Sequence, residues 1–171
     1  VSSLVTGSGS VDLRQSGGGD LTFGDVSAST SATIINQGGS VALNGTLVSD
    51  SLAVTATGSL SDGDSGAISV AGLGTVSASD ITLGDSAGNA TNFGGLIFTS
   101  PGGVSITEDS SLIVAGGSTA GAGLDLTSDG NVRVDGTVTV VGDTIFSATG
   151  EIVVNAKLNG TGTIRSEEHT S

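Results

Sequence analysis

Two aspartates separated by one glycine, Asp62-Gly63-Asp64, have the spacing with which many calcium loops begin. An EF-hand loop starting at Asp62 would need a further acid at its fifth position and a Glu at its twelfth. Gly66 and Leu73 stand there instead, so that motif fails. Gly17-Gly18-Gly19-Asp20, the nearest approach to a repeats-in-toxin nonapeptide, has no tandem copies. We interpret these acids as solvated turn residues and predict no metal or cofactor site, with a weak calcium site as the alternative.

Polysaccharide cleavage would need a pair of carboxylates facing the sugar and, in a lyase, a base. Sugar sites commonly add Trp or Tyr, and the chain has neither. Arg133 and Lys157 occupy neighbouring template positions one repeat apart, and Asp135 and Asp143 lie near Arg133 in the sequence. Isolated outward charges on strands usually only solvate a surface. We predict no catalytic residues and no enzyme, with a polysaccharide-active enzyme fragment as the less favoured alternative.

Other polar motifs are common in chains rich in Ser and Thr. Thr-x-Thr pairs at Thr55/Thr57, Thr137/Thr139 and Thr161/Thr163 would form an ice-binding array only if one face carried them on every repeat, and Thr is favoured on strands regardless. Sequons at Asn44, Asn89 and Asn159 would accept glycans only beside a suitable glycosyltransferase. The four aromatic residues are expected to fill wide parts of the core or to cap a corner, with ligand stacking as the less favoured alternative: Phe23, Phe93, Phe98 and Phe146.

Composition excludes several classes of protein. The 171 residues include 17 Asp and Glu against 4 Lys and Arg, a net charge of −13, so nucleic acid is a poor partner. No Cys is present, which removes disulfides and thiolate sites. No apolar run reaches the roughly 20 residues needed to span a bilayer. The mean hydropathy of +0.30 argues against disorder.

The segments around these polar motifs alternate apolar and small polar residues with a period of two. This alternation indicates strands that are buried on one face. A shared template, apolar-x-apolar followed by Asn or Asp, begins at Val41, Val132 and Ile152, with looser copies at Val11, Ile68 and Val104. A second pair matches Leu21-Thr22-Phe23-Gly24-Asp25 with Ile81-Thr82-Leu83-Gly84-Asp85. The copies at Val132 and Ile152 lie twenty residues apart. Repeats of roughly 20–50 residues are typical of solenoids and other repeat arrays.

We therefore predict an all-β parallel β-helix (β-solenoid) of roughly six to eight rungs, each about 20–28 residues long. Inward aliphatic ladders would include Val41, Leu43, Leu47, Val132, Val134 and Val138. Pro101 cannot donate a hydrogen bond to a ladder and is expected between strands. An immunoglobulin-like sandwich is the alternative, but it usually has a large central aromatic residue and long hairpin strands.

Residues 81–112, from Ile-Thr-Leu-Gly-Asp-Ser to Thr-Glu-Asp-Ser-Ser-Leu, resemble the β-strand repeats of filamentous-haemagglutinin-like exoproteins and autotransporter passengers. The resemblance extends over about residues 1–164. It implies a right-handed β-helix that is secreted, displayed at the bacterial cell surface in association with the outer membrane, and used in adhesion or biofilm formation. The implied partners are an unknown host or cell-surface receptor or polysaccharide and the outer-membrane export machinery. A secreted matrix or surface-layer solenoid without adhesive function is the alternative.

The two ends suggest a fragment of a larger protein. The chain begins at Val1, so any signal peptide would lie upstream. Residues 165–171, Arg-Ser-Glu-Glu-His-Thr-Ser, resemble the translation of a common sequencing adapter, with a disordered polar tail as the other interpretation. We expect residues 1–164 to be a β-solenoid segment and the natural protein to continue past Ile164.

Overall fold

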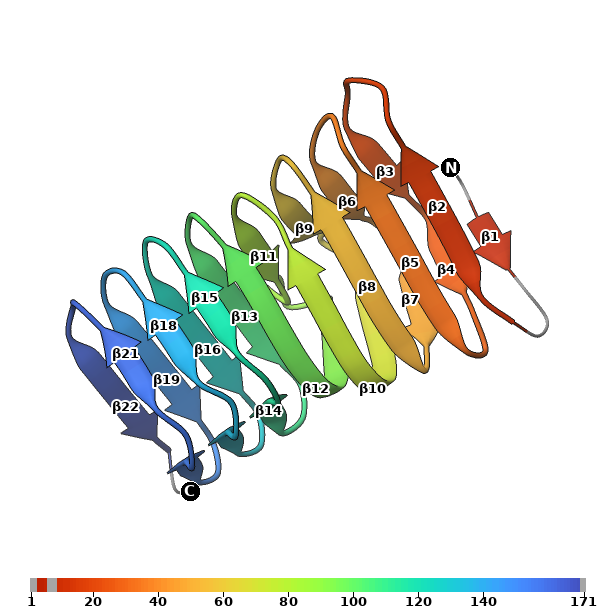
Figure 1. Cartoon of the computed structure of the whole chain (residues 1–171). Helices are drawn as coiled ribbons and strands as arrows, with labels where there is room; N and C mark the ends of the chain where they lie inside the picture. The colour runs from red at the N-terminus through yellow and green to blue at the C-terminus, as the bar shows by residue number, and fades with distance from the viewer. Residues whose placement is uncertain (1–2, 6–8, 170–171) are drawn as a thin grey trace.

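The computed structural model describes residues 3–5 and 9–169. These residues form 22 β-strands and no helix, and the strands pair in parallel in a 14-stranded and an 8-stranded sheet. Figure 1 shows a right-handed coil that advances from β1 at one end to β22 at the other. The eight stacked strands of the second sheet mark eight rungs, so the predicted parallel β-solenoid is confirmed.

Each rung contributes strands to three faces of the solenoid. Face 1 contains β1 (Ser3–Val5), β4 (Asp25–Ser27), β7 (Thr46–Ser49), β14 (Leu112–Val114), β17 (Val132–Val134) and β20 (Ile152–Val154). Face 2 contains β2 (Val11–Gln15), β5 (Ser31–Asn36), β8 (Ser51–Ala56), β15 (Ser118–Ala120), β18 (Val138–Val140) and β21 (Leu158–Gly160). The long strands β10 (Ala67–Ser77) and β12 (Ala90–Ser100) run from face 1 onto face 2 and join both faces into one sheet.

Face 3 is the 8-stranded sheet. Its strands are β3 (Leu21–Phe23), β6 (Val41–Leu43), β9 (Leu60–Asp62), β11 (Ile81–Leu83), β13 (Val104–Glu108), β16 (Leu124–Ser128), β19 (Thr144–Ala148) and β22 (Ile164–Glu168). The register continues through β22, where Thr144 pairs with Ile164 and Ala148 with Glu168. Residues 165–168 therefore continue the solenoid, while residues 170–171 of the same tail lie outside the described residues.

The core consists of aliphatic ladders, because alternate residues of every strand point into the coil. The six positions expected to face inward are all at most 2% exposed: Val41, Leu43, Leu47, Val132, Val134 and Val138. The four Phe side chains are at most 3% exposed, which confirms their expected place in the core. Each fully buried aliphatic side chain contributes about 1.5–3 kcal/mol relative to exposure. The core is thus a continuous column rather than a central globule.

The sequence template does not mark one structural position. Val132 pairs with Ile152 on face 1, so those two copies stack as expected. The copy at Val41 lies on face 3, where it pairs with Leu21 and Leu60. The template failed to separate the faces because strands on all three share the same inward–outward alternation. The second matched pair does mark one position, since Leu21 and Ile81 both begin face-3 strands.

Rung length changes along the solenoid. Leu112, Val132 and Ile152 stack at steps of twenty residues. Ala67 pairs with Ala90, twenty-three residues on, whereas Leu96 pairs with Val114, only eighteen residues on. Irregular loops are therefore concentrated between β9 and β14. Pro101 lies in the turn between β12 and β13, as predicted from its missing N–H.

Candidate functional site

Several turn acids near the corners bind the next rung rather than standing free in solvent. Asp20 Oδ1 accepts the Ser40 N–H at 2.8 Å, and Asp80 Oδ1 accepts the Gly103 N–H at 3.1 Å. Strands leave backbone donors unpaired where they end, so a carboxylate there replaces a missing ladder acceptor. These acids therefore hold neighbouring rungs together. Asp20, the acid of the Gly17–Asp20 motif, is one of them.

Asp62 differs from these acids because its side chain faces the interior. It is 7% exposed at the end of β9, two positions after the inward Leu60. Its Oδ2 accepts the Gly84 N–H at 2.9 Å and the Thr91 hydroxyl at 3.4 Å, whereas Oδ1 has no hydrogen-bond partner. Burial raises the pKa of Asp62. The predicted solvated turn acid is thus a buried carboxylate at this position.

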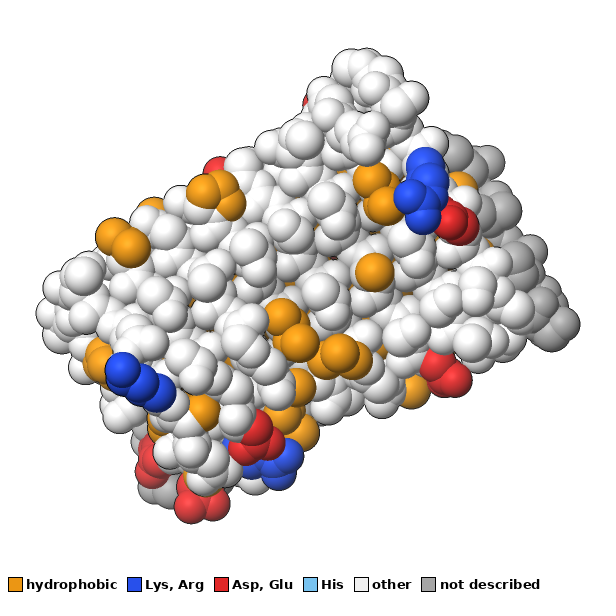
Figure 2. Space-filling view, in the orientation of Figure 1, with side chains coloured by type: hydrophobic (Ala, Val, Ile, Leu, Met, Phe, Trp, Pro, Cys, Tyr) orange, Lys and Arg blue, Asp and Glu red, His pale blue; other side chains and the backbone are white. Residues whose placement is uncertain are grey.

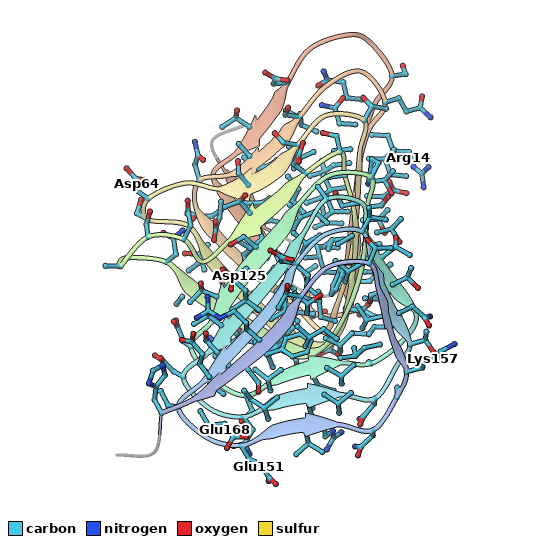
Figure 3. All side chains as sticks on the ribbon, turned by 90° about the vertical axis from the view of Figure 1, so that its left-hand side faces the viewer. Arg14, Asp64, Asp125, Glu151, Lys157 and Glu168 are labelled. Carbon is cyan, nitrogen blue, oxygen red and sulfur yellow. The ribbon has the colours of Figure 1, made fainter. Side chains whose placement is uncertain are left out.

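Asp64, the second aspartate of the motif, stands on an exposed loop away from the strand faces (Figure 3). Its Oδ1 accepts a hydrogen bond of 3.3 Å from the Ser86 hydroxyl in the loop of the next rung. Within residues 3–5 and 9–169, no three His, Cys, Asp or Glu side chains are grouped so that they could hold a metal ion. Asp62 and Asp64 therefore do not form a site made of acids alone.

Arg133, Asp135, Lys157 and Asp143 do not form one site. Arg133 and Asp135 make an exposed ion pair of 2.7 Å, and Asn155 Nδ2 donates to Asp135 at 2.9 Å. The Asn155 hydrogen bond, with the Arg133 charge, lowers the pKa of Asp135. Val153 stacks on Arg133 in the next rung, whereas Lys157 lies just before β21. Asp143 lies at the corner between faces 2 and 3, where it binds the Thr163 N–H.

An open groove of about 330 Å³ runs over face 3. Its lining includes Asp80, Asp125 and Asp143 together with Thr82 and Ser105. Asp80 and Asp143 each use Oδ1 to bind the next rung, which leaves Asp125 as the groove carboxylate with no such bond among the described residues. The groove has no aromatic platform and no base among its lining residues. It is an open, mainly apolar recess without the paired groups that sugar cleavage requires.

Face 2 carries no charged side chain from β5 to β18. Its outward positions form a column in which Thr55, Ser77, Thr99, Thr119 and Thr139 stack in register. Figure 2 shows this face towards the viewer, with acidic and basic side chains confined to its ends and edges. A chain of net charge −13 therefore presents one broad neutral surface.

The hydroxyl column was not evident from the Thr-x-Thr pairs. Thr55 and Thr139 lie in it, but Thr57 and Thr161 lie in turns outside the strands. The twenty-residue spacing of Thr99, Thr119 and Thr139 was the signal that could have revealed it.

Of the sequon asparagines, Asn44 is exposed and Asn89 is buried, so Asn89 is a poor glycan acceptor in the folded chain.

The described residues contain no helix that is long and apolar enough to cross a membrane.

Comparison with protein families matches the chain to "Repeats of unknown function (DUF5649)" over residues 30–100 and 101–166. The two matched segments meet at Pro101, in the turn between β12 and β13. Comparison with curated proteins found no match, and comparison with solved structures found none.

Proposed function

Because the chain belongs to this family of repeats, which cover most of it, we propose that it is a non-catalytic structural and adhesive segment of a large secreted bacterial surface protein. Its eight stacked rungs act as a stiff stalk. Face 2 is the contact surface, and its partner is a host or cell-surface receptor or a polysaccharide. The segment acts outside the cell, at the bacterial surface.

The main support for this proposal is that face 2 has no charged side chain from β5 to β18. The other sixteen acids of the chain, all but Asp12 of β2, would repel most bacterial and host surfaces, which are themselves acidic. Removing charge from one face lets that face approach a partner without desolvating ions. The stacked hydroxyls of Thr99, Thr119 and Thr139 supply hydrogen-bonding groups at the ~4.8 Å strand spacing. A rigid row of small groups loses little side-chain entropy on contact.

The arrangement of acids supports a non-catalytic function. Asp20, Asp80 and Asp143 each hold a backbone N–H of the next rung with one carboxylate oxygen. Movement of such a side chain towards a substrate would break a bond between rungs. The isolated Arg133–Asp135 pair is exposed and already neutralised.

Bead retention under flow tests the proposal. Beads coated with the purified chain are passed over cultured epithelial cells and over immobilised polysaccharide, and the retained fraction is counted. Thr99→Glu/Thr119→Glu places two charges on face 2, whereas Thr107→Glu/Thr127→Glu places two charges at stacked outward positions of face 3. We expect the first variant to lose retention and the second to keep it. Equal retention of uncoated beads, or equal loss in both variants, would overturn the adhesive assignment in favour of a coating component.

A further inference from the structure

Two long loops stack at the corner where face 3 turns into face 1. The first joins β9 to β10 across residues 63–66, and the second joins β11 to β12 across residues 84–89. They accompany the longest step in the solenoid, in which Ala67 pairs with Ala90. At the equivalent corner after β16, only three residues separate Ser128 from Val132. The extra residues therefore create a local structure that the regular rungs lack.

The inner wall of this corner contains polar groups without partners. Asp62 Oδ1 has no hydrogen-bond partner, although the side chain is only 7% exposed. Asn89 is also 7% exposed, and neither its Oδ1 nor its Nδ2 has a partner. The Asn89 amide lies beside the Asp62 carboxyl group and lowers its pKa by hydrogen bonding, although no hydrogen bond of regular geometry joins the two side chains. Buried polar atoms without partners are costly and rare in folded proteins.

The local backbone holds these two side chains in place. The Asn89 N–H donates to Ser86 O at 2.9 Å, which closes a turn just before β12. The Gly84 N–H and the Thr91 hydroxyl, at 2.9 and 3.4 Å, both bind Asp62 Oδ2, so Oδ1 is the oxygen left for another partner. Asp62 Oδ1 and Asn89 Oδ1 are thus two buried oxygens without a regular hydrogen-bond partner at this corner.

The rim of the corner is acidic. Asp85 is exposed beside Gly84, and its charge raises the pKa of Asp62. Asp64 lies on the neighbouring loop, tied to Ser86 (Figure 3). No Lys or Arg is present between Arg14 and Arg133, so no basic residue of this region balances the three carboxylates. A cation would relieve both the repulsion and the burial of charge.

We propose that this corner binds one calcium ion through Asp62 Oδ1 and Asn89 Oδ1. Ca²⁺ accepts carboxylate, amide, backbone carbonyl and water oxygens in flexible numbers, which suits a site with one inner carboxylate. Carbonyl groups of the two loops and water complete the shell, and Asp64 and Asp85 attract the ion from the rim. This ligand set is not an EF-hand and does not require three grouped acids.

Glu108 provides an internal comparison. It is fully buried and its Oε2 lacks a partner, but Oε1 accepts the Phe93 N–H at 2.7 Å. No amide without a partner lies beside it among the described residues. Burial raises the pKa of Glu108 to about 7, which permits a neutral carboxylic acid near neutral pH. A buried carboxyl oxygen without a partner therefore does not by itself define the calcium site. The site is defined by the Asp62 carboxyl group together with the Asn89 amide.

Calorimetry of the full chain tests the proposal. After chelation, the wild-type chain is titrated with CaCl₂ or MgCl₂, and its Tm is measured with each salt. Calcium at about 100 times Kd is expected to raise the Tm by about 5–10 °C. Asp62→Asn should lose the calcium response, and Asp64→Asn/Asp85→Asn should weaken it without altering the core. Asn89→Asp should lower the Tm in chelator and enlarge the rise with calcium. Glu108→Gln, the matched control, should respond like the wild type.

Three results would contradict the proposed calcium site. A wild-type Tm that is the same in calcium and chelator would overturn the proposal. So would an undiminished calcium response in Asp62→Asn, because ions bound elsewhere on the acidic surface would then explain it. An equal response to Mg²⁺ would overturn calcium as the ion, since Mg²⁺ requires a stricter octahedral shell.

Discussion

Asp143 Oδ1 accepts a hydrogen bond of 2.8 Å from the backbone N–H of Thr163, which lies one rung further along the solenoid. Asn131 Oδ1 makes the same bond to the Glu151 N–H at 2.8 Å. Asp20 and Asp80 do so on earlier rungs. Carboxylates and amides at the corners thus continue the backbone ladders beyond the strand ends. Five of the seventeen acids (Asp20, Asp25, Asp62, Asp80 and Asp143) thus join one rung to the next through a backbone N–H.

Removal of one corner acceptor should weaken the solenoid locally. Asp143→Ala leaves the Thr163 N–H without its acceptor and is expected to cost about 1 kcal/mol, since water reaches this exposed corner. Asp129→Ala is the control, because Asp129 is exposed and its carboxylate makes no hydrogen bond within the described residues. Thermal unfolding followed by circular dichroism should show a lower Tm only for Asp143→Ala. Equal Tm values for the two variants would contradict the assignment.

Glu108 should make stability depend on pH. Its pKa is about 7 in the folded chain and near 4.5 when solvated, so the folded state holds the proton more tightly. The resulting stabilisation is complete below about pH 4.5 and is lost as pH rises through about 7, by an amount on the order of 3 kcal/mol at most. Glu108→Gln cannot ionise and should remove this component.

Denaturant unfolding at pH 5 and pH 8 measures that difference. The variant has to be compared with the wild type at each pH, because the raised pKa of Asp62 acts in the same direction. We expect the wild type to lose more stability than Glu108→Gln between the two values. Parallel losses would show that Glu108 is not the titrating group.

Gly142 should not tolerate a side chain. Its φ is 106°, and an added Cβ would lie 1.7 Å from Ala122 O on the preceding rung. Gly142→Ala is therefore expected to cost more than the roughly 1 kcal/mol of a simple left-handed glycine replacement. Gly117→Ala is the matched control, because a Cβ there meets no atom within 4 Å. Differential scanning calorimetry should show a large loss of Tm for the first variant alone, and comparable Tm values would rule out the close approach.

Phe98 should be essential to the core column, whereas its neighbour should not. Phe98 has no exposed surface, and truncation to Ala is expected to cost about 3–5 kcal/mol by leaving a cavity. Thr99 points outward on face 2, and Thr99→Ala should change stability by no more than about 0.5 kcal/mol. Urea unfolding distinguishes the two. A small loss for Phe98→Ala would mean that the rungs close over the gap.

The buried position of Asp62 was partly evident in the sequence. Position 62 is two residues after Leu60, so strict alternation placed it inward. The adjoining Gly63 and Asp64 suggested a solvated turn instead. Its neighbour Asn89 could not have been identified, because twenty-seven residues and a whole rung separate the two positions.

The sequence by itself determined the period-two alternation, the aliphatic core positions and the need for turns at Gly and Pro101. These are local properties, set by each residue and its immediate neighbours. Only the tertiary structure decided which face each repeat occupies, the neutral column on face 2, and the meeting of Asp62 with Asn89. The reason is that stacking depends on the cumulative length of the rungs, which varies from eighteen to twenty-three residues. Loops such as 63–66 and 84–89 take up the extra residues, so equivalent positions recur at irregular intervals along the sequence, and no local pattern records those intervals.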